Sequence, residues 1–330
     1  MPTPVLGAPR PLAADDVANR PCRNAHRGYA RPMPGPESTI TATAAGTFTL
    51  GDLTVTRMGF GSMRLTVSRD VERALTVLRR AAELGVNHVD TAAFYVSPGG
   101  ILEGDPGPPR YATELIREAL APYDDLVITT KVGPGIREDG TFYQASTADD
   151  LRRQVEENLR RLGVDRLDVV NLRIIKKAGK DSVAERFEAL ARMREEGLVR
   201  HLGLSNVRLD HLVEAQRIAP VVCVQNSYAL DNQQDAPLLR ACGQRGIAFV
   251  PFFAIAGSGR EKGPVSSHAP GLSQVARAHG VTEQQVRLAW TLHQGRHVLA
   301  IPGTGNPDHL DENIAAAAIR LSQEELAILT

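Results

Sequence analysis

The chain has 330 residues, of which 42% are hydrophobic and 23% charged, and its formal net charge is zero. This composition is typical of a soluble globular protein of one or two domains, and the charge balance disfavours binding to nucleic acid or to a membrane surface. No apolar run reaches the roughly 18 residues that a membrane span needs, and the N-terminus lacks the apolar core of a secretory signal. Three distant cysteines, Cys22, Cys223 and Cys242, show no metal-ligand spacing, so we expect a cytoplasmic protein without a metal.

The first 44 residues are rich in proline, alanine and arginine and have no apolar periodicity. Such a segment cannot bury enough surface to offset its ordering entropy, so residues 1–44 are predicted to be a disordered extension and residues 45–330 the folded domain. A targeting peptide is the alternative, disfavoured by three acidic residues at positions 15, 16 and 37. Order is expected to begin with a β-hairpin, residues 47–50 and 53–56, around Gly51-Asp52.

From residue 57 onward, short apolar strands alternate with amphipathic helices. Helical patterns occupy 71–84, 111–121, 148–162, 183–197, 208–217, 235–245, 271–294 with a break near Gly280, 307–316 and 322–329. Strands are predicted at 57–60, 86–89, 126–131, 167–172, 200–204, 221–225, 247–252 and 297–301. This alternation predicts an α/β fold, a (β/α)₈ TIM barrel capped at one end by the hairpin. A doubly wound sheet is the alternative, but the first strand lacks the third glycine of a dinucleotide-binding turn.

Residues 87–95, Asn-His-Val-Asp-Thr-Ala-Ala-Phe-Tyr, place Asp90 and Tyr95 just beyond a predicted strand, and Lys131 ends the next strand. In a barrel, chemistry takes place at the carboxyl ends of the strands. A phenol, a lysine and a carboxylate meeting there can deliver a proton, because a nearby cation stabilises the phenolate. The structural alternatives are an N-cap aspartate, a core tyrosine and a surface lysine.

Polar groups also end the other strands, and the motifs that contain them resemble those of the aldo-keto reductase family from about residue 46 onward. The motifs are Gly-Phe-Gly-Ser-Met at 59–63, Val-Asp-Thr-Ala at 89–92, Thr-Thr-Lys-Val at 129–132, Gly-Leu-Ser-Asn-Val at 203–207, Val-Gln-Asn at 224–226, Ile-Pro-Gly-Thr-Gly-Asn at 301–306 and His-Leu-Asp-Glu-Asn at 309–313. The resemblance implies NAD(P)H-dependent reduction of a small-molecule aldehyde or ketone to an alcohol. Tyr95 would be the general acid, Lys131 its activator and Asp90 the residue that holds Lys131.

The fourth catalytic position departs from the family, which usually has a histidine there. In Asp168-Val-Val-Asn-Leu-Arg173 this position holds Arg173, whose guanidinium is permanently charged and presents several hydrogen-bond donors in a fork-shaped arrangement. It is expected either to bind the carbonyl oxygen or to hold an anionic or phenolate-bearing substrate, and the alternative is an impaired site in which it pairs with a carboxylate. The Asn-Leu-Arg sequence resembles a bacterial branch that includes pyridoxal reductases, which makes a pyridoxal-like or other small aromatic aldehyde a candidate substrate.

The resemblance also implies the cofactor contacts. Ser205, Asn206 and Gln225 would bind the nicotinamide carboxamide and Phe252 would stack on the ring, although core packing is the alternative for Phe252. NADPH is the expected cofactor and NADH the alternative, because Gly303 and His309 occupy positions where NADPH-preferring members often carry lysine and arginine. Residues 303–313 are predicted to be a phosphate loop at a helix N-terminus. The remaining expected cofactor contacts are Gly61, Ser62, Met63, Asp90, Thr304, Asn306, Glu312 and Asn313. Arg260 and Lys262 are expected either to close over the pyrophosphate or to lie in an ordinary solvated loop.

A Gly/Pro-rich loop at 96–110 directly follows Tyr95 and is expected to contact substrate through Ile101, Leu102 and Arg110. Two other functions remain open at this point. One is a non-catalytic nicotinamide-binding redox sensor or regulatory subunit, favoured by Arg173. The other is a Schiff-base aldolase built on Lys131, which the hairpin cap and the phosphate loop disfavour.

Overall fold

The computed structural model describes residues 39–329 except 138, 178 and 256–270. Regular structure begins with a short 3₁₀ helix, η1 (Ala42–Ala45), in which Ala42 is fully buried. Regular structure among the described residues therefore extends a few residues to the N-terminal side of the predicted boundary at residue 45. Residues 1–38 of the predicted extension, together with Arg260 and Lys262, lie outside the described residues.

The predicted hairpin is confirmed as β1 (Thr47–Leu50) and β2 (Leu53–Thr56), which pair antiparallel. Gly51 makes the turn possible, because its φ of 67° is one that residues with a side chain rarely adopt. Leu50 and Val55 belong to one apolar cluster with residues of several barrel strands, including Val127 and Leu299. The hairpin therefore closes the amino-terminal end of the barrel and leaves the opposite end open.

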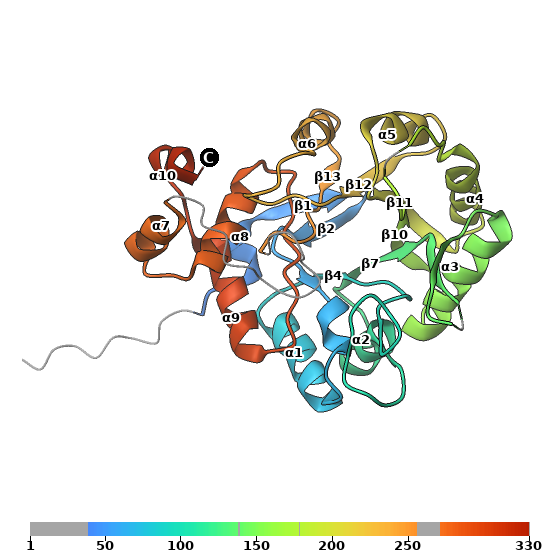
Figure 1. The fold of residues 1–330 in the computed structure, drawn as a ribbon, viewed down its shortest axis with the longest axis horizontal. Helices are drawn as coiled ribbons and strands as arrows, with labels where there is room; N and C mark the ends of the chain where they lie inside the picture. The colour runs from blue at the N-terminus through green and yellow to red at the C-terminus, as the bar shows by residue number, and fades with distance from the viewer. Residues whose placement is uncertain (1–38, 138, 178, 256–270, 330) are drawn as a thin grey trace, which may run out of the picture. The chain divides into compact units, whose positions relative to one another are not determined.

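Seven parallel strands form one curved sheet in the order β13-β12-β11-β10-β7-β4-β3, surrounded by helices (Figure 1). In chain order they are β3 (Phe60–Gly61), β4 (His88–Asp90), β7 (Val127–Val132), β10 (Leu167–Arg173), β11 (Val199–Ser205), β12 (Val221–Gln225) and β13 (Ala248–Phe249). The sheet order follows the chain order, as right-handed βα units in a barrel require.

The eighth strand predicted at 297–301 is present as paired backbone rather than as a continuous strand. On one side Phe249 N donates to His297 O at 2.8 Å, and on the other Gly59 N donates to Ala300 O at 2.8 Å. Parallel bridges join Phe249 with Val298 and Met58 with Ala300. This segment therefore bonds to both edges of the seven-stranded sheet and closes the barrel, which confirms the predicted (β/α)₈ fold.

The helices match their predicted positions to within a few residues. They are α1 (Val71–Glu83), α2 (Ala112–Leu120), α3 (Ala148–Leu162), α4 (Ala184–Glu195), α5 (Leu209–Gln216), α6 (Ala236–Gln244), α7 (Leu272–His279), α8 (Glu283–His293), α9 (Pro307–Ala315) and α10 (Gln323–Leu329). The predicted break at Gly280 is real, and Thr282 caps α8 in a capping box with Gln285. In the described part of the chain, no helix has the length and apolar character needed to cross a membrane.

Two small antiparallel ladders on the open end of the barrel were not predicted. The loop after Tyr95 is pinned at its two ends by β5 (Val96–Ser97) pairing with β6 (Arg110–Tyr111). A second ladder, β8 (Pro134–Ile136) with β9 (Phe142–Gln144), follows β7. These strands have two or three residues each, which is too short for an alternating apolar pattern to appear in the sequence.

Candidate active site

The open end of the barrel brings together the polar residues at the carboxyl ends of its strands. Gly61, Asp90, Arg173, Ser205 and Gln225 are each the last residue of a strand. Because parallel strands of a barrel end on one face, these side chains converge there, as the sequence predicted.

Asp90 and Lys131 form a buried ion pair in the centre of this face. Lys131 Nζ donates to Asp90 Oδ1 at 2.5 Å and to the carbonyl oxygen of Thr91 at 2.9 Å. The lysine side chain is 1% exposed and the aspartate side chain 4%. Two charges so far from solvent are tolerated because they neutralise each other and because backbone and side-chain hydrogen bonds satisfy the remaining atoms.

Tyr95 lies against this ion pair, with Lys131 Nζ 4.7 Å from the centre of the phenol ring. A backbone turn presents the ring, since Tyr95 N donates to Ala92 O at 3.0 Å. Phe94 supports it edge-on, with ring centres 5.3 Å apart. The three residues predicted to form the proton-delivering group therefore meet in the structure.

Tyr95 and Asp90 line a narrow pocket of about 120 Å³. The pocket is completed by Gly61, Met63, Arg64, Ile101, Arg173, Phe252, Phe253, Ile301 and Gly303. Arg64 and Phe253 were not predicted, although each directly follows a predicted residue, and Ile301 belongs to a predicted motif without having been assigned a role. A pocket with one phenol, one carboxylate and two guanidinium groups on mainly apolar walls suits a small planar molecule.

Arg173 points into this pocket without a carboxylate partner among the described residues. Its guanidinium carbon lies 4.9 Å from the centre of the Phe252 ring, and its Nη1 donates to Ser205 Oγ at 3.0 Å. The predicted alternative, an impaired site in which a carboxylate neutralises Arg173, has no counterpart in this part of the structure. The remaining donors of the guanidinium are free to face an anion or a carbonyl oxygen.

The residues predicted to hold a nicotinamide carboxamide lie side by side, because Ser205 and Gln225 pair in register on adjacent strands. Asn206 follows with a φ of 57°, an uncommon value for a residue with a side chain, and its Nδ2 donates to Ile174 O at 2.7 Å. Gln225 Oε1 is buried and lacks a hydrogen-bond partner among the described residues. A buried acceptor of this kind fits a group that brings its own N–H.

Two glycines, Gly61 and Gly303, allow two backbone segments to approach each other closely at the edge of the pocket. A Cβ on Gly303 would lie 2.3 Å from the carbonyl oxygen of Gly61, and a Cβ on Gly61 would lie 2.7 Å from that of Ile301. Ser62, between this contact and the pocket residue Met63, is fully buried, and its Oγ also has no partner in the described region. The backbone segments around Gly61 and Gly303 form a cradle at the edge of the pocket, and their close approach depends on the absence of side chains at both glycines.

The predicted phosphate loop leads into the N-terminus of α9. Asn306 caps this helix, its Oδ1 accepting from Asp308 N at 3.1 Å, and Asn306 N donates to Thr304 Oγ1 at 3.0 Å. These bonds leave the Thr304 hydroxyl proton and Asn306 Nδ2 available as donors. On the helix itself His309 and Glu312 are exposed and Asn313 is buried.

Of the three residues predicted to contact substrate, only Ile101 lines the pocket. Leu102 is buried, and its carbonyl oxygen accepts from Ser97 Oγ at 2.9 Å. The prediction for Arg110 does not fit the structure, because its buried guanidinium donates to the backbone oxygens of Thr66, Val67, Asp105 and Pro108. Arg110 thus organises the substrate loop instead of facing the pocket.

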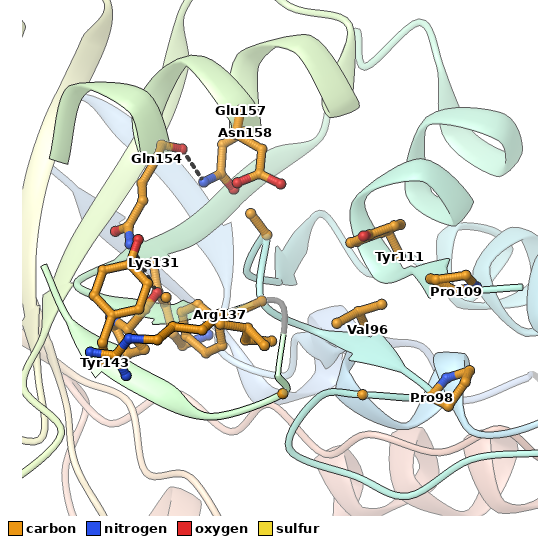
Figure 2. A pocket seen from close by; sticks show the side chains of 17 residues that line it. Val96, Pro98, Pro109, Tyr111, Lys131, Arg137, Tyr143, Gln154, Glu157 and Asn158 are labelled. Atoms are coloured by element: carbon orange, nitrogen blue, oxygen red, sulfur yellow. Dashed lines mark hydrogen bonds between the residues drawn. The ribbon is translucent and has the colours of Figure 1, made fainter. Parts of the chain in front are cut away.

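A larger cavity of about 410 Å³ lies beside the small pocket, between the loop after Tyr95, the β8–β9 ladder and α3 (Figure 2). Glu157 and Asn158 of α3 border one side, and Arg137 and Tyr143 face Pro98, Pro109 and Tyr111 across it. Phe94 and Lys131 line this cavity as well. The Phe94–Tyr95 pair therefore separates the two spaces.

A polar layer lies beneath Asp90 and Lys131 inside the barrel. His88, on the same face of β4 as Asp90, is 1% exposed, and burial lowers the pKa of its imidazole to about 4. Its Nε2 is 3.1 Å from Thr129 Oγ1. The imidazole is therefore neutral at neutral pH. Separately, no group of three or more His, Cys, Asp or Glu side chains in the described ranges could hold a metal ion.

Comparison with known proteins gives the class of protein. The sequence profile of the aldo/keto reductase family matches residues 57–330. The chain is 42% identical over 297 residues to pyridoxine 4-dehydrogenase of Escherichia coli, covering 87% of this chain and 98% of that protein. It is also 37% identical over 299 residues to an uncharacterized oxidoreductase of Schizosaccharomyces pombe, covering 88% and 91% of the two chains. The protein therefore belongs to the aldo/keto reductase family of oxidoreductases.

Solved structures agree with this assignment. An aldo/keto reductase from Klebsiella pneumoniae in complex with NADP and acetate superimposes with a TM-score of 0.69 at 26% identity, covering 86% of this chain and 93% of that one. A thermostable aldo-keto reductase bound to the inhibitor epalrestat gives a TM-score of 0.70 at 28% identity, with 86% and 98% covered. The barrel fold is thus shared with these structures.

Proposed function

We propose that this protein reduces a small aromatic aldehyde, such as pyridoxal, to its alcohol with NADPH, and that it runs the reverse oxidation, with NADP⁺ as the hydride acceptor, when the alcohol and NADP⁺ are in excess. The observation that carries the proposal is the Asp90–Lys131–Tyr95 group at the wall of a pocket that also contains Arg173. The bound cofactor supplies the hydride. The chain supplies the proton, the orientation and the exclusion of water.

In the direction of reduction, Tyr95 gives its phenolic proton to the carbonyl oxygen as that oxygen gains electrons. The Lys131 ammonium, 4.7 Å from the ring centre, stabilises the phenolate left behind. Asp90 holds the ammonium in place through the 2.5 Å bond. The buried position of this ion pair strengthens the electrostatic effect, because little water screens it.

Arg173 is proposed to select the substrate. Pyridoxal carries a phenolate oxygen next to its aldehyde, and the free donors of a guanidinium can bind that oxygen while the aldehyde faces Tyr95. The name of the Escherichia coli relative, pyridoxine 4-dehydrogenase, supports the same class of substrate. The stacking of Arg173 on Phe252 keeps the guanidinium at the pocket wall.

The residues present fit a nicotinamide cofactor. Ser205, Asn206 and Gln225 would hold the carboxamide, and Phe252 would face the ring. Gly61, Ser62, Met63 and Gly303 would contact the cofactor at the cradle, and the N-terminus of α9, with Thr304 and Asn306, would hold a phosphate. NADPH is the cofactor of choice because the Klebsiella pneumoniae structure contains NADP. His309, Glu312 and Asn313, on the helix that follows the loop, would contact the adenosine end of the cofactor.

The proposal is tested by following NADPH oxidation by absorbance with pyridoxal and with benzaldehyde, and repeating both with NADH. We expect turnover of pyridoxal with NADPH as the better cofactor. The Tyr95→Phe variant should bind NADPH normally and lose at least about 100-fold in kcat, because general acid catalysis contributes about 10²–10⁴-fold. Retained turnover in Tyr95→Phe would remove Tyr95 from the role of acid.

The role of Arg173 is tested with Arg173→His, which restores the residue usual in the family. Turnover of benzaldehyde should rise or stay constant, while kcat/KM for pyridoxal should fall by about tenfold or more, the effect of losing a charged hydrogen bond. An equal response of both substrates would contradict substrate selection by Arg173. NADPH binding without turnover of any carbonyl compound would instead support a redox sensor.

An aldolase is not supported. Lys131 Nζ is hydrogen-bonded to Asp90 and to Thr91 O and is buried, so it is not poised to attack a carbonyl carbon. Borohydride treatment in the presence of pyridoxal should therefore leave Lys131 unlabelled.

A further inference from the structure

The cavity of about 410 Å³ beside the small pocket has the size and the walls of a ligand site (Figure 2). Pockets that hold small molecules have volumes of about 300–1,000 Å³. The proposed reaction takes place in the small pocket and leaves this cavity without a role. Aromatic rings and prolines supply much of its wall, namely Phe94, Tyr111, Tyr143, Pro98, Pro109 and Pro134. Flat apolar walls of this kind suit an aromatic ring.

Two short ladders hold the opposite walls of this cavity in place. On one side β5 pairs with β6 at the two ends of the loop after Tyr95, and on the other β8 pairs with β9. Gly135 pairs with Tyr143 in this second ladder, and a Cβ on Gly135 would lie 2.3 Å from Tyr143 Cε1. The Tyr143 ring therefore lies directly on the backbone of the neighbouring strand, which fixes it as a flat wall.

The side of the cavity formed by α3 has its polar atoms already paired. Gln154 Nε2 donates to Pro134 O at 3.1 Å, and Gln154 Oε1 accepts from Gly133 N at 2.7 Å. Asn158 Nδ2 donates to Gln154 O at 2.8 Å, and Asn158 Oδ1 accepts from Thr130 Oγ1 at 2.5 Å. A ligand therefore has few polar groups to satisfy on this side.

The charged side chains of the cavity leave one positive charge uncompensated. Among the described residues, the charged side chains that line it are Lys131, Arg137 and Glu157. Lys131 is paired with Asp90, and Glu157 Oε1 accepts from Arg161 Nε at 2.9 Å. Arg137 is left, so the charge balance favours a ligand with a single negative charge.

Arg137 is placed to bind the anionic group of such a ligand. Its guanidinium carbon lies 5.1 Å from the centre of the Tyr143 ring, which orients it beside that wall. Its Nη1 donates to Thr141 Oγ1 and to Phe142 O at 3.4 Å each, and no carboxylate within the described ranges pairs with it. The other guanidinium donors can therefore bind a carboxylate in the two-pronged manner typical of arginine.

Phe94 and Lys131 connect this cavity to the group that delivers the proton. Both line the cavity, and the Phe94 ring meets Tyr95 edge-on with ring centres 5.3 Å apart. A negative charge placed in the cavity would offset part of the effect by which Lys131 stabilises the Tyr95 phenolate. Occupancy of the cavity should therefore slow proton delivery although the ligand never enters the small pocket.

We propose that this cavity is a regulatory site for a small aromatic monoanion, such as an aromatic carboxylate, whose ring lies between Phe94 and Tyr143 and whose anionic group binds Arg137. The effect on turnover rests on the proposed function, whereas binding of the ligand does not. The inference goes beyond that function because it assigns a second ligand, with its own cavity, to the far side of the Phe94–Tyr95 pair.

Calorimetric titration of the wild-type protein, saturated with NADP⁺, tests the binding without any turnover. The probes are 2-naphthoate and its neutral analogue 2-naphthamide, which has the same rings. We expect 2-naphthoate to bind about tenfold more tightly, the effect of a charged hydrogen bond to Arg137. Equal binding of the two probes would overturn the proposal.

Two variants assign the preference to the cavity. Arg137→Gln should bind both probes equally, within about twofold, because it loses the charge at the cavity. Arg173→Gln is the matched control, since Arg173 lines the small pocket, and it should keep the tenfold ratio. A ratio that persists in Arg137→Gln, or that disappears in Arg173→Gln, would place the anion outside the cavity and refute the site.

Inhibition kinetics at saturating NADPH test the effect on turnover. With pyridoxal as the aldehyde, saturating 2-naphthoate should lower kcat by about fivefold, the size of a typical coupling between two sites, and leave KM within about twofold. Arg137→Gln should keep the uninhibited kcat and lose the inhibition, and Arg137→Lys, which retains the charge, should recover part of it. A raised KM at constant kcat would place the probe in the small pocket, and an unchanged kcat would refute regulation.

The two proposals fail separately in these experiments. Charge-selective binding at Arg137 without turnover of any aldehyde would refute the reductase activity and keep the second site. Turnover that 2-naphthoate does not alter would keep the activity and refute the regulatory role. Because Arg137 is exposed, its replacement should leave the fold intact, and the titration of the wild-type protein needs no variant.

Discussion

The buried ion pair between Asp90 and Lys131 predicts a large and strongly non-additive effect on stability. Both side chains are nearly inaccessible, at 4% and 1%, and they are 2.5 Å apart. Replacing one member of such a pair leaves a buried charge without its partner, which costs about 3–5 kcal/mol, whereas removing both charges is often nearly neutral. Asp90→Asn and Lys131→Met should therefore each lower the free energy of unfolding by about 3 kcal/mol or more.

The double variant Asp90→Asn/Lys131→Met should be more stable than either single variant. We expect it within about 2 kcal/mol of the wild-type protein, since it contains no unpaired buried charge, which corresponds to a coupling of at least about 4 kcal/mol. Urea unfolding of the four proteins at pH 7, followed by circular dichroism, measures each value. All three variants should lose turnover because Tyr95 loses its activator.

The result that refutes this reasoning is additivity. If the double variant loses the sum of the two single losses, the charges contribute independently and do not form a mutually dependent pair. Arg80→Met/Asp311→Asn provides the matched control, because that ion pair is about half exposed and should show a coupling of about 1 kcal/mol or less.

Other predictions follow from buried groups outside the proposed chemistry. Because burial lowers the pKa of His88 from 6.5 to about 4, the unfolded chain binds a proton in this interval that the folded chain does not, so the free energy of unfolding should fall by about 3 kcal/mol between pH 7 and pH 4. Urea titrations at these two pH values should show a smaller fall in His88→Gln; an equal fall would assign the loss to other groups. Burial raises the pKa of the Cys223 and Cys242 thiols to about 12, so mass spectrometry should find both unmodified by iodoacetamide until urea is added. Arg110→Met should lower the free energy of unfolding by about 2 kcal/mol, measured by urea unfolding, and raise KM for the aldehyde, because four backbone carbonyls, two of them in the loop at 96–110, lose a donor. An unchanged KM would show that the loop does not shape the substrate site.

Helix positions, the hairpin and the fold class could be predicted from the sequence because they depend on local patterns. Apolar residues at helical spacing marked each helix, and Thr282 with Gln285 marked the start of α8. The eighth strand at 297–301 was less predictable in its details, since it is held only by pairing with two distant edges, around Met58 and Phe249.

The sequence also placed Asp90, Tyr95, Lys131 and Arg173 on one face, because every strand of a parallel barrel ends on the same side. The hydrogen-bond and ion-pair partners of these side chains could not be predicted in the same way. Whether Arg173 was neutralised by a carboxylate, and whether Arg110 faced substrate or backbone, could not be read from neighbouring residues in the chain. Both answers depend on groups more than 30 positions away, such as Ser205 for Arg173 and Thr66 for Arg110.

The sequence by itself thus determined the barrel and the set of polar side chains that converge at its open end, since periodicity and strand ends are properties of short stretches of chain. Only the tertiary structure decided how those side chains are joined. The hydrogen bond from Gln225 Nε2 to Asp90 Oδ2 spans 135 positions of sequence, and it exists because barrel closure brings the ends of β12 and β4 to opposite sides of one narrow interior. No local pattern in the sequence encodes the spatial distance between these two strand ends, which is set by the packing of the whole sheet.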